Sequence, residues 1–316
     1  MAKLTVISPG ALSTIQDEGR YGYMSTGFSP GGAMDSYSMK IANILVGNAP
    51  GDGVIEMTMI GASVKFDCTT VIAVTGADME PDINGKSIKM YSSVEVQSGD
   101  VLTFHAAVSG MRCYLAVAGG FDLPIVMGSM STNLKCAIGG FEGRKLMRGD
   151  EIPLRCSVSH ELIGRRKIPE PEKNGDSIVV KVMLGPQDDY FTDKGIETFL
   201  SSEYTVSDKS DRMGVRLEGE AVENKNGVDI ISDAIATGAV QIPASGTPII
   251  MMADRQTTGG YAKIATVISA DLRKIAQARP GTKIRFEAVS EKEAVRLKKK
   301  DEKKLKLLIY RSHYSR

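Results

Sequence analysis

The sequence predicts a mainly β protein with a few short helices, and three observations support this prediction. Short apolar runs rich in β-branched residues are separated by Gly, Asp and Asn about every ten residues, which is typical of barrels or sandwiches. Helical patterns are few. The chain has 316 residues, of which 42% are hydrophobic and 24% are charged. This length suits one large or two medium domains, and either can bury a sizeable core.

The expected strands are short runs of apolar and β-branched residues. In the first half of the chain they are 3–7, 54–58, 63–66, 70–76, 101–104 and 113–120. In the second half they are 178–185, 239–243, 248–253, 264–269 and 283–289. Their number and the turns between them favour barrels or sandwiches over a parallel sheet covered by helices.

Four stretches predict helices. Residues 35–48 begin at a plausible N-cap and stop at a Gly-Asn pair. Residues 192–202 give a weaker pattern because a Gly interrupts them, and 270–281 end at a Pro-Gly pair. Ser290 and Glu293 have the spacing of a capping box and open a C-terminal helix.

The best candidate for a linker is the polar, Pro-containing stretch 160–176. We therefore expect an N-terminal β domain over 1–160 and a C-terminal β domain over 175–290. A basic helix or tail then covers 291–316. Such a charge run is usually a solvated face.

Composition excludes several classes of protein. The net charge is +1, so nothing in the overall charge indicates nucleic acid. No apolar run approaches the roughly 18–20 residues that cross a bilayer, and the N-terminus shows no signal-peptide pattern. The four cysteines are far apart and the three histidines lack metal-ligand spacing. We expect a reduced, cytoplasmic protein with no metal site, no nucleic-acid partner and no membrane partner.

Two short motifs resemble cofactor motifs but lack their context. The segment "INGKS" at 83–87 looks like the end of a phosphate loop, yet Glu80 stands where that loop needs its first Gly. Lys40 in "SMKI" lies in a helical pattern and not in the hairpin turn of a biotin-accepting domain. We therefore expect neither an ATP-binding phosphate loop nor a biotinylated lysine from these motifs.

Four polar clusters, dense in Gly and side-chain donors, are the candidate site segments. They are 14–23, 29–35, 128–146 and 210–219, the last extended by Gln241 and the stretch 253–272. In the first cluster, Gln16, Asp17 and Arg20 fall in one turn-like segment. Each cluster alone is more often a solvated turn. Together they favour a binding site, because Gly admits a ligand close to the backbone while Arg, Gln and Thr offer differently directed donors.

The fourth cluster holds the candidate charged groups. If this segment is a strand, Arg212 and Arg216 face the same side, and their two guanidinium groups can bind a carboxylate, carbamate or phosphate. If it is a turn, the two side chains do not face the same side. Asp254 is a candidate acid, base or orienting group. The alternative for Asp254 is a structural ion pair with Arg255.

Several longer motifs together resemble one known family. They are "TIQDEGRYGY", "GGAMD", "IANILVGN", "LAVAGGFDLPIVMGSMST", "IGGFEGRKL", "GPQDDYF", "SDRMGVRLEG" and "DRQTTGGYAKIA". In this order, over about residues 3–290, the chain resembles the allophanate-hydrolase-subunit-2 family of biotin-dependent carboxyltransferases. That family includes the C subunit of bacterial 5-oxoprolinase, the antikinase antagonist KipA and part of urea carboxylase. Family members often have Pro where this chain has Ala262.

The resemblance implies two cyclophilin-like β-barrel domains, which agrees with the expected strands. It also implies partners, namely a KipI-like protein (the B subunit) and a LamB/YcsF-like protein (the A subunit). The expected function is that of the C subunit in an ATP-dependent 5-oxoprolinase complex, which hydrolyses 5-oxo-L-proline to L-glutamate. ATP, together with Mg, would be the co-substrate of the complex.

Two other functions remain open. One is a carboxyltransferase component for urea or another small amide, with biotin supplied by a partner. The other is a KipA-like regulator that binds a KipI-like kinase inhibitor. All three would keep the same scaffold.

We assign individual roles as hypotheses. The expected catalytic residues are Asp254, Arg212 and Arg216. The expected substrate-binding residues are Gln16, Asp17, Arg20, Gln241, Gln256, Thr257, Thr258 and Tyr261. We further expect 254–261 to be a binding loop at a barrel mouth, facing the "SDRMG" and "QDEGR" segments.

Overall fold

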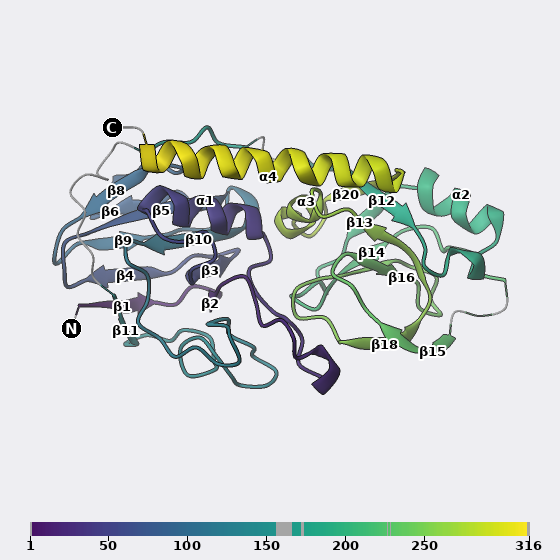
Figure 1. Cartoon of the computed structure of the whole chain (residues 1–316), viewed down its shortest axis with the longest axis horizontal. Coiled ribbons are helices and arrows are strands. Elements are labelled where there is room, and N and C mark those ends of the chain that lie inside the picture. The colour runs from purple at the N-terminus through teal and green to yellow at the C-terminus, as the bar shows by residue number, and fades with distance from the viewer. Residues whose placement is uncertain (1, 156–165, 172–173, 226, 228, 315–316) are drawn as a thin grey trace. The chain divides into compact units, whose positions relative to one another are not determined.

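The chain folds into two compact units, seen in the computed structural model (Figure 1). The structure describes residues 2–155, 166–171, 174–225, 227 and 229–314, the last four without their side chains. The first unit comprises Met1–Tyr21, Gly31–Lys173 and Leu305–Arg316. The second comprises Gly22–Pro30 and Asn174–Lys304. Residues 160–165 and 172–173 of the expected linker lie outside the described part of the chain.

Among the described residues, the first unit contains eleven strands, one complete α-helix and the end of the C-terminal helix. Its elements are β1 (Lys3–Ser8), β2 (Leu12–Gln16), α1 (Ser36–Val46), β3 (Val54–Thr58), β4 (Ser63–Phe66), β5 (Thr70–Asp78), β6 (Asp82–Ile83), β7 (Lys86–Ser87), β8 (Ser93–Val96), β9 (Val101–Thr103), β10 (Ser109–Val117) and β11 (Glu151–Pro153). They form a six-stranded sheet in the order β11-β1-β4-β9-β6-β7 and a five-stranded sheet in the order β2-β3-β10-β5-β8.

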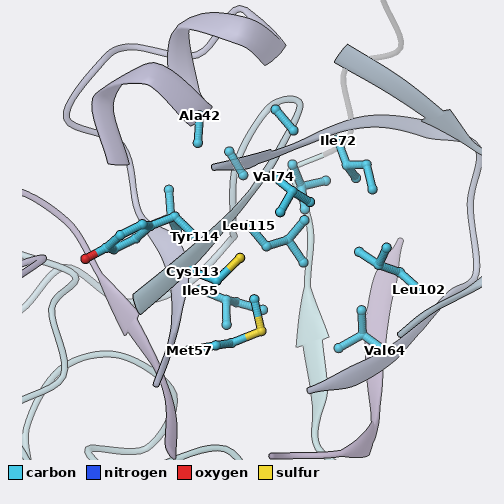
Figure 2. Packing of buried hydrophobic residues seen from close by; sticks show 14 of the residues in the cluster. Ala42, Ile55, Met57, Val64, Ile72, Val74, Leu102, Cys113, Tyr114 and Leu115 are labelled. Atoms are coloured by element: carbon cyan, nitrogen blue, oxygen red, sulfur yellow. The ribbon is translucent and has the colours of Figure 1, made fainter. Parts of the chain in front are cut away.

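The core of the first unit gathers side chains from both sheets and from α1. Figure 2 shows Val64 and Leu102 of the six-stranded sheet near Met57 and Leu115 of the five-stranded sheet. Strand β10 is buried continuously from Met111 to Val117, so both faces of this central strand are covered. Its apolar run from Cys113 to Val117 is typical of a fully buried strand for this reason.

Helix α1 forms where the sequence predicts it. Asp35 is its N-cap: the carboxylate accepts hydrogen bonds from the backbone N–H of Ser38 at 3.0 Å and from the Ser38 hydroxyl at 2.7 Å. The helix ends at Gly47, whose φ of 81° lies in the left-handed region that favours glycine. Local chemistry therefore fixes both ends of this helix.

The second unit is built around a closed barrel. Its elements are η1 (Met24–Thr26), β12 (Ser177–Leu184), η3 (Asp188–Tyr190), α2 (Asp193–Ser201), β13 (Tyr204–Val206), β14 (Gly214–Glu218), β15 (Asp229–Ala234), β16 (Ala239–Gln241), β17 (Ile249–Met251), β18 (Thr258–Tyr261), β19 (Lys263–Val267), α3 (Leu272–Gln277), β20 (Lys283–Ala288) and α4 (Glu291–Tyr314), whose last residues belong to the first unit. The barrel order is β12-β19-β16-β17-β14-β13-β20, and β15 and β18 form a separate two-stranded sheet.

The barrel closes where β12 pairs with β20 in parallel, from Ser177 opposite Lys283 to Val182 opposite Ala288. An aromatic cluster packs at this seam. Phe199 of α2 stacks on Phe286 of β20 with ring centroids 4.4 Å apart. The mainly β prediction is thus confirmed, and the closed barrel agrees with the expected architecture.

The C-terminal helix forms within the expected segment 291–316. Helix α4 has 24 residues and continues to Tyr314. Its N-terminus uses half of the predicted capping box: the Glu293 N–H donates to the Ser290 hydroxyl at 3.3 Å. The Glu293 carboxylate instead accepts two hydrogen bonds from Arg296, both at 2.7 Å. Among the described residues, no helix has the length and apolarity to cross a membrane.

Candidate functional site

A buried ion pair joins two of the predicted catalytic residues. Arg212 precedes β14 and Asp254 follows β17, and these strands pair antiparallel. The Arg212 Nε donates to Asp254 Oδ2 at 2.7 Å and Nη2 donates to Oδ1 at 3.1 Å. The side chains are only 7% and 16% exposed. This fork-to-fork contact fixes the orientation of both groups.

The two arginines of this cluster do not face one side. Arg212 lies in a bend before β14 and is buried, whereas Arg216 lies on β14 and is exposed. The strand alternative for the pair is therefore wrong, and the turn alternative holds for Arg212. The ion pair of Asp254 is formed with Arg212. Arg255 donates to the carbonyl oxygens of Ile235 at 2.9 Å and Met252 at 3.3 Å.

The segment predicted as a binding loop is partly a strand. Thr258–Tyr261 form β18, which pairs antiparallel with β15 through Ala234 opposite Thr258 and Asp229 opposite Tyr261. We call this two-stranded sheet the ribbon. Gln256 and Thr258 are exposed, and Tyr261 is 42% exposed. The Thr257 carbonyl accepts from the Ile235 N–H at 3.0 Å, which ties the base of the ribbon together.

Gln241 connects the barrel to the ribbon. It ends strand β16, is 5% exposed, and donates from Nε2 to the Tyr261 carbonyl at 3.2 Å. A Cβ on Gly259 would lie 2.9 Å from this same Nε2. The same Cβ would lie 2.6 Å from Ile235 Cδ1, so a side chain at position 259 would displace the ends of the Ile235 and Gln241 side chains.

Lys263 is a functional candidate that the sequence analysis missed. It lies opposite Gln241 in the β16–β19 pairing and its side chain is 2% exposed. Its Nζ donates to Asp233 Oδ2 at 2.7 Å and to the Ala234 carbonyl at 3.0 Å. The expected strand begins at 264, which leaves this lysine outside it. The one signal in the sequence is a single Lys directly before the apolar, β-branched run 264–269.

Asp233 of β15 is the exposed partner of this buried lysine. Its carboxylate also accepts from Gln187 Nε2 at 3.2 Å. The hydrogen bond from Lys263 holds the pKa of the Asp233 carboxyl below its ordinary value. The carboxylate therefore stays ionised at neutral pH and forms a true ion pair with the ammonium.

The first cluster forms a polar network inside the first unit. The Asp17 carboxylate accepts from the backbone N–H groups of Gly19 and Met130 and from the hydroxyls of Ser129 and Ser131. Every one of these donors lies within the unit, so Asp17 organises the turn of residues 129–131. In the sequence, Ser129 and Ser131 stand out only as part of a Gly-rich segment.

Gln16 and Arg20 are completely buried beside this network. Arg20 donates from Nε to the Val126 carbonyl at 3.0 Å and from Nη2 to the Ser131 carbonyl at 2.9 Å. Within the described part of the chain, Arg20 Nη1 and Gln16 Oε1 are buried without a hydrogen-bond partner. Both side chains therefore serve the interior of the first unit, and their facing toward 254–261 stays a prediction.

In the ranges that the structure describes, no three His, Cys, Asp or Glu side chains gather into a possible metal site. Two of the ion pairs of the second unit lie at the candidate site, Arg212 with Asp254 and Lys263 with Asp233. Such pairs can orient a polar small molecule and stabilise developing charge.

A family model described as "Carboxyltransferase domain, subdomain A and B" matches residues 26–288. The chain is 40% identical over 302 residues to the 5-oxoprolinase C subunit of Haemophilus influenzae, a match that covers 95% of each chain. It is 36% identical over 315 residues to the 5-oxoprolinase C subunit of Escherichia coli, covering 98% of this chain and 99% of that one.

Longer proteins match over the same region. Urea amidolyase of Saccharomyces cerevisiae is 33% identical over 327 residues, covering 96% of this chain and 18% of that protein. The crystal structure of the Kluyveromyces lactis urea carboxylase is 31% identical with a TM-score of 0.89, covering 97% of this chain and 29% of that one. The fold is therefore that of a segment of these larger enzymes.

Proposed function

Because this chain belongs to the carboxyltransferase-domain family, as its motifs predicted, we propose that it is the C subunit of an ATP-dependent 5-oxoprolinase. The observation that carries the proposal is the share of each relative's length that this chain matches. The chain spans 95% and 99% of two relatives named as 5-oxoprolinase C subunits, but only 18% of a urea amidolyase. We further propose that the protein is cytoplasmic and that ATP is the co-substrate of the complex.

The proposed reaction opens the lactam of 5-oxo-L-proline. Transfer of the γ-phosphoryl group of ATP to the lactam oxygen gives ADP and an O-phosphorylated imidate. Water then attacks the activated carbon, and the C–N bond breaks to leave the amine. A second water hydrolyses the resulting acyl phosphate and releases phosphate and L-glutamate. Coupling to ATP is needed because the lactam amide is otherwise a poor electrophile.

The candidate residues suit charge stabilisation in this sequence of steps. We propose that Arg212 and Arg216 stabilise the negative charge that develops on the lactam or phosphoryl oxygens. Asp254 orients Arg212 through two hydrogen bonds. Arg216 is exposed, which leaves its guanidinium accessible to a ligand. The proposed amide contacts are Gln241, the ribbon residues Thr258 and Tyr261, and Gln256 and Thr257, which precede the ribbon strand β18.

A reconstitution tests the proposal directly. We expect the purified chain to show little 5-oxoproline-dependent ATP hydrolysis, because the sequence has no phosphate loop and the relatives are named as subunits. Addition of the two proposed partners, the KipI-like protein and the LamB/YcsF-like protein, should restore it. The measurement is ADP and L-glutamate released together with Mg-ATP. Full activity of the single chain, or none in the complex, contradicts the proposal.

A carboxyltransferase role is the second candidate, favoured by the family description and the urea amidolyase match. In that case the chain would act on urea or another small amide, and biotin would come from a partner protein. Recovery of a biotinylated protein with this chain, together with urea-dependent ATP cleavage, would favour this function over the lactam reaction.

The ribbon residues give a further test of the site. If Gln256 and Thr258 contact substrate, Gln256→Ala and Thr258→Val should each cost about 0.5–1.5 kcal/mol of binding. A contact made only in the transition state would cost about 2.7–4 kcal/mol. Both side chains are exposed, so stability should change by no more than about 0.5 kcal/mol. The measurement is kcat/KM in the assembled complex, with melting temperature as control. If the kinetics of both variants are unchanged, Gln256 and Thr258 belong to a structural turn and do not contact the substrate.

A further inference from the structure

We propose that Lys263 recognises the carboxylate of the substrate, and that Asp233 on the ribbon holds the ammonium until the substrate carboxylate replaces it. This inference rests on the proposed function, because it names the part of 5-oxo-L-proline that Lys263 would bind. It adds a residue pair that was absent from the predicted site.

The first argument is the asymmetry of the ion pair. The Lys263 side chain is 2% exposed, whereas that of Asp233 is 51% exposed. An isolated ammonium in the interior is very costly, so the barrel would not retain a lysine here without an anion at hand. The anion, however, sits on the surface and can leave into water at little cost. Such an arrangement suits an exchangeable partner better than a permanent one.

The second argument is the number of donors. An ammonium has three N–H donors. Among the residues described by the structure, Lys263 Nζ has two acceptors, Asp233 Oδ2 and the Ala234 carbonyl. A carboxylate with two oxygens can take the place of the Asp233 oxygen and reach the remaining donor. The buried charge therefore stays compensated throughout the exchange.

The third argument is the position of Gln241. It lies opposite Lys263 in the β16–β19 register, at a register shift between Val240 and Gln241 that is typical of a β-bulge. Its amide donates to the Tyr261 carbonyl of the ribbon. A lactam carrying a carboxylate presents an amide oxygen and an anion close together. Lys263 and Gln241 offer a cation and an amide donor at neighbouring positions.

The fourth argument is the weak attachment of the ribbon that covers these two residues. Strands β15 and β18 pair only with each other among the described strands, and two-stranded sheets are marginally stable alone. Ile231 of β15 is 95% exposed, so its side chain does not anchor the ribbon to the barrel. Three of the bonds that hold the ribbon down come from Lys263 and Gln241 themselves. A ligand that satisfies these side chains therefore removes three of the bonds that hold the ribbon, while Gln187 still donates to Asp233.

The test compares three variants in the assembled complex, Lys263→Met, Asp233→Asn and Lys194→Met. Lys194 is exposed on α2 and serves as the matched control for loss of one positive charge. Lys263→Met should raise KM for 5-oxo-L-proline about 10- to 100-fold with kcat within about twofold, since a charge-assisted hydrogen bond is lost. Asp233→Asn should lower that KM, because it removes the competing carboxylate. Lys194→Met should leave KM unchanged.

A neutral lactam separates recognition from structure. Inhibition by 2-pyrrolidinone, which lacks the carboxylate, should be equally strong in the wild-type and Lys263→Met complexes. If Lys263→Met fails to fold, the Asp233→Asn variant decides, because its asparagine oxygen can still accept a hydrogen bond from Lys263, and its melting temperature shows whether the barrel is folded. Equal weakening for both lactams, or a raised KM in Asp233→Asn, overturns the inference and leaves the proposed function standing. A wild-type complex without 5-oxoproline-dependent ATP hydrolysis overturns both.

Discussion

Asp254→Asn is expected to lower the free energy of unfolding by about 3–5 kcal/mol, the usual cost of removing one partner of a buried ion pair. Arg212 is 7% exposed at its side chain and makes two hydrogen bonds to the Asp254 carboxylate. The asparagine keeps the shape of the side chain but not its charge. The guanidinium, whose side chain is 7% exposed, then loses its carboxylate with little water to compensate for it.

Arg216→Gln is the matched control for this prediction. Arg216 is exposed on β14, so its replacement should change stability by no more than about 0.5 kcal/mol. Urea unfolding followed by circular dichroism measures both variants, since the chain contains no tryptophan. If Asp254→Asn and Arg216→Gln unfold at the same urea concentration, the pair contributes nothing to stability. Its retention would then have to be explained by catalysis alone.

Asp17→Ala is expected to lower the free energy of unfolding by at least about 1–3 kcal/mol, the cost of leaving one buried donor, here the Met130 N–H, without an acceptor. The backbone N–H groups of Gly19 and Met130 both donate to this carboxylate. The hydroxyls of Ser129 and Ser131 also lose this acceptor, although a hydroxyl can rotate toward another.

Glu18→Ala is the neighbouring control. Glu18 pairs with Lys40 at 2.6 Å, but its side chain is 53% exposed. Exposed ion pairs contribute about 0–1 kcal/mol, so this variant should melt close to the wild-type protein. The measurement is the melting temperature of the intact chain by calorimetry. A wild-type melting temperature for Asp17→Ala would show that the turn at 129–131 does not depend on this carboxylate.

The sequence predicted those elements whose determinants are local. The N-cap and the terminal glycine of α1 lie within one turn of the helix, and they mark its ends as the structure has them. Strands such as β3 and β4 are short apolar runs and appear at the predicted bounds. The ribbon was not predicted, because "TTGGY" has two glycines and pairs with a segment about thirty residues away.

The candidate site was predicted in its residue types but not in its contacts. Arg212 and Asp254 are 42 residues apart, and Lys263 and Asp233 are 30 residues apart. Such pairs depend on strand register, which a pattern of single residues does not determine. The assignment of Gln16 and Arg20 to substrate binding stays a prediction, although their side chains are completely buried.

The division of the chain has a consequence for the order in which its parts are completed during synthesis. The first unit includes Leu305–Arg316, and Leu305 and Leu308 pack against its core. These leucines leave the ribosome only after every residue of the second unit. Until these leucines have been synthesised, part of the apolar surface of the first unit stays uncovered. A nascent chain of this protein would need protection from aggregation longer than its N-terminal position suggests.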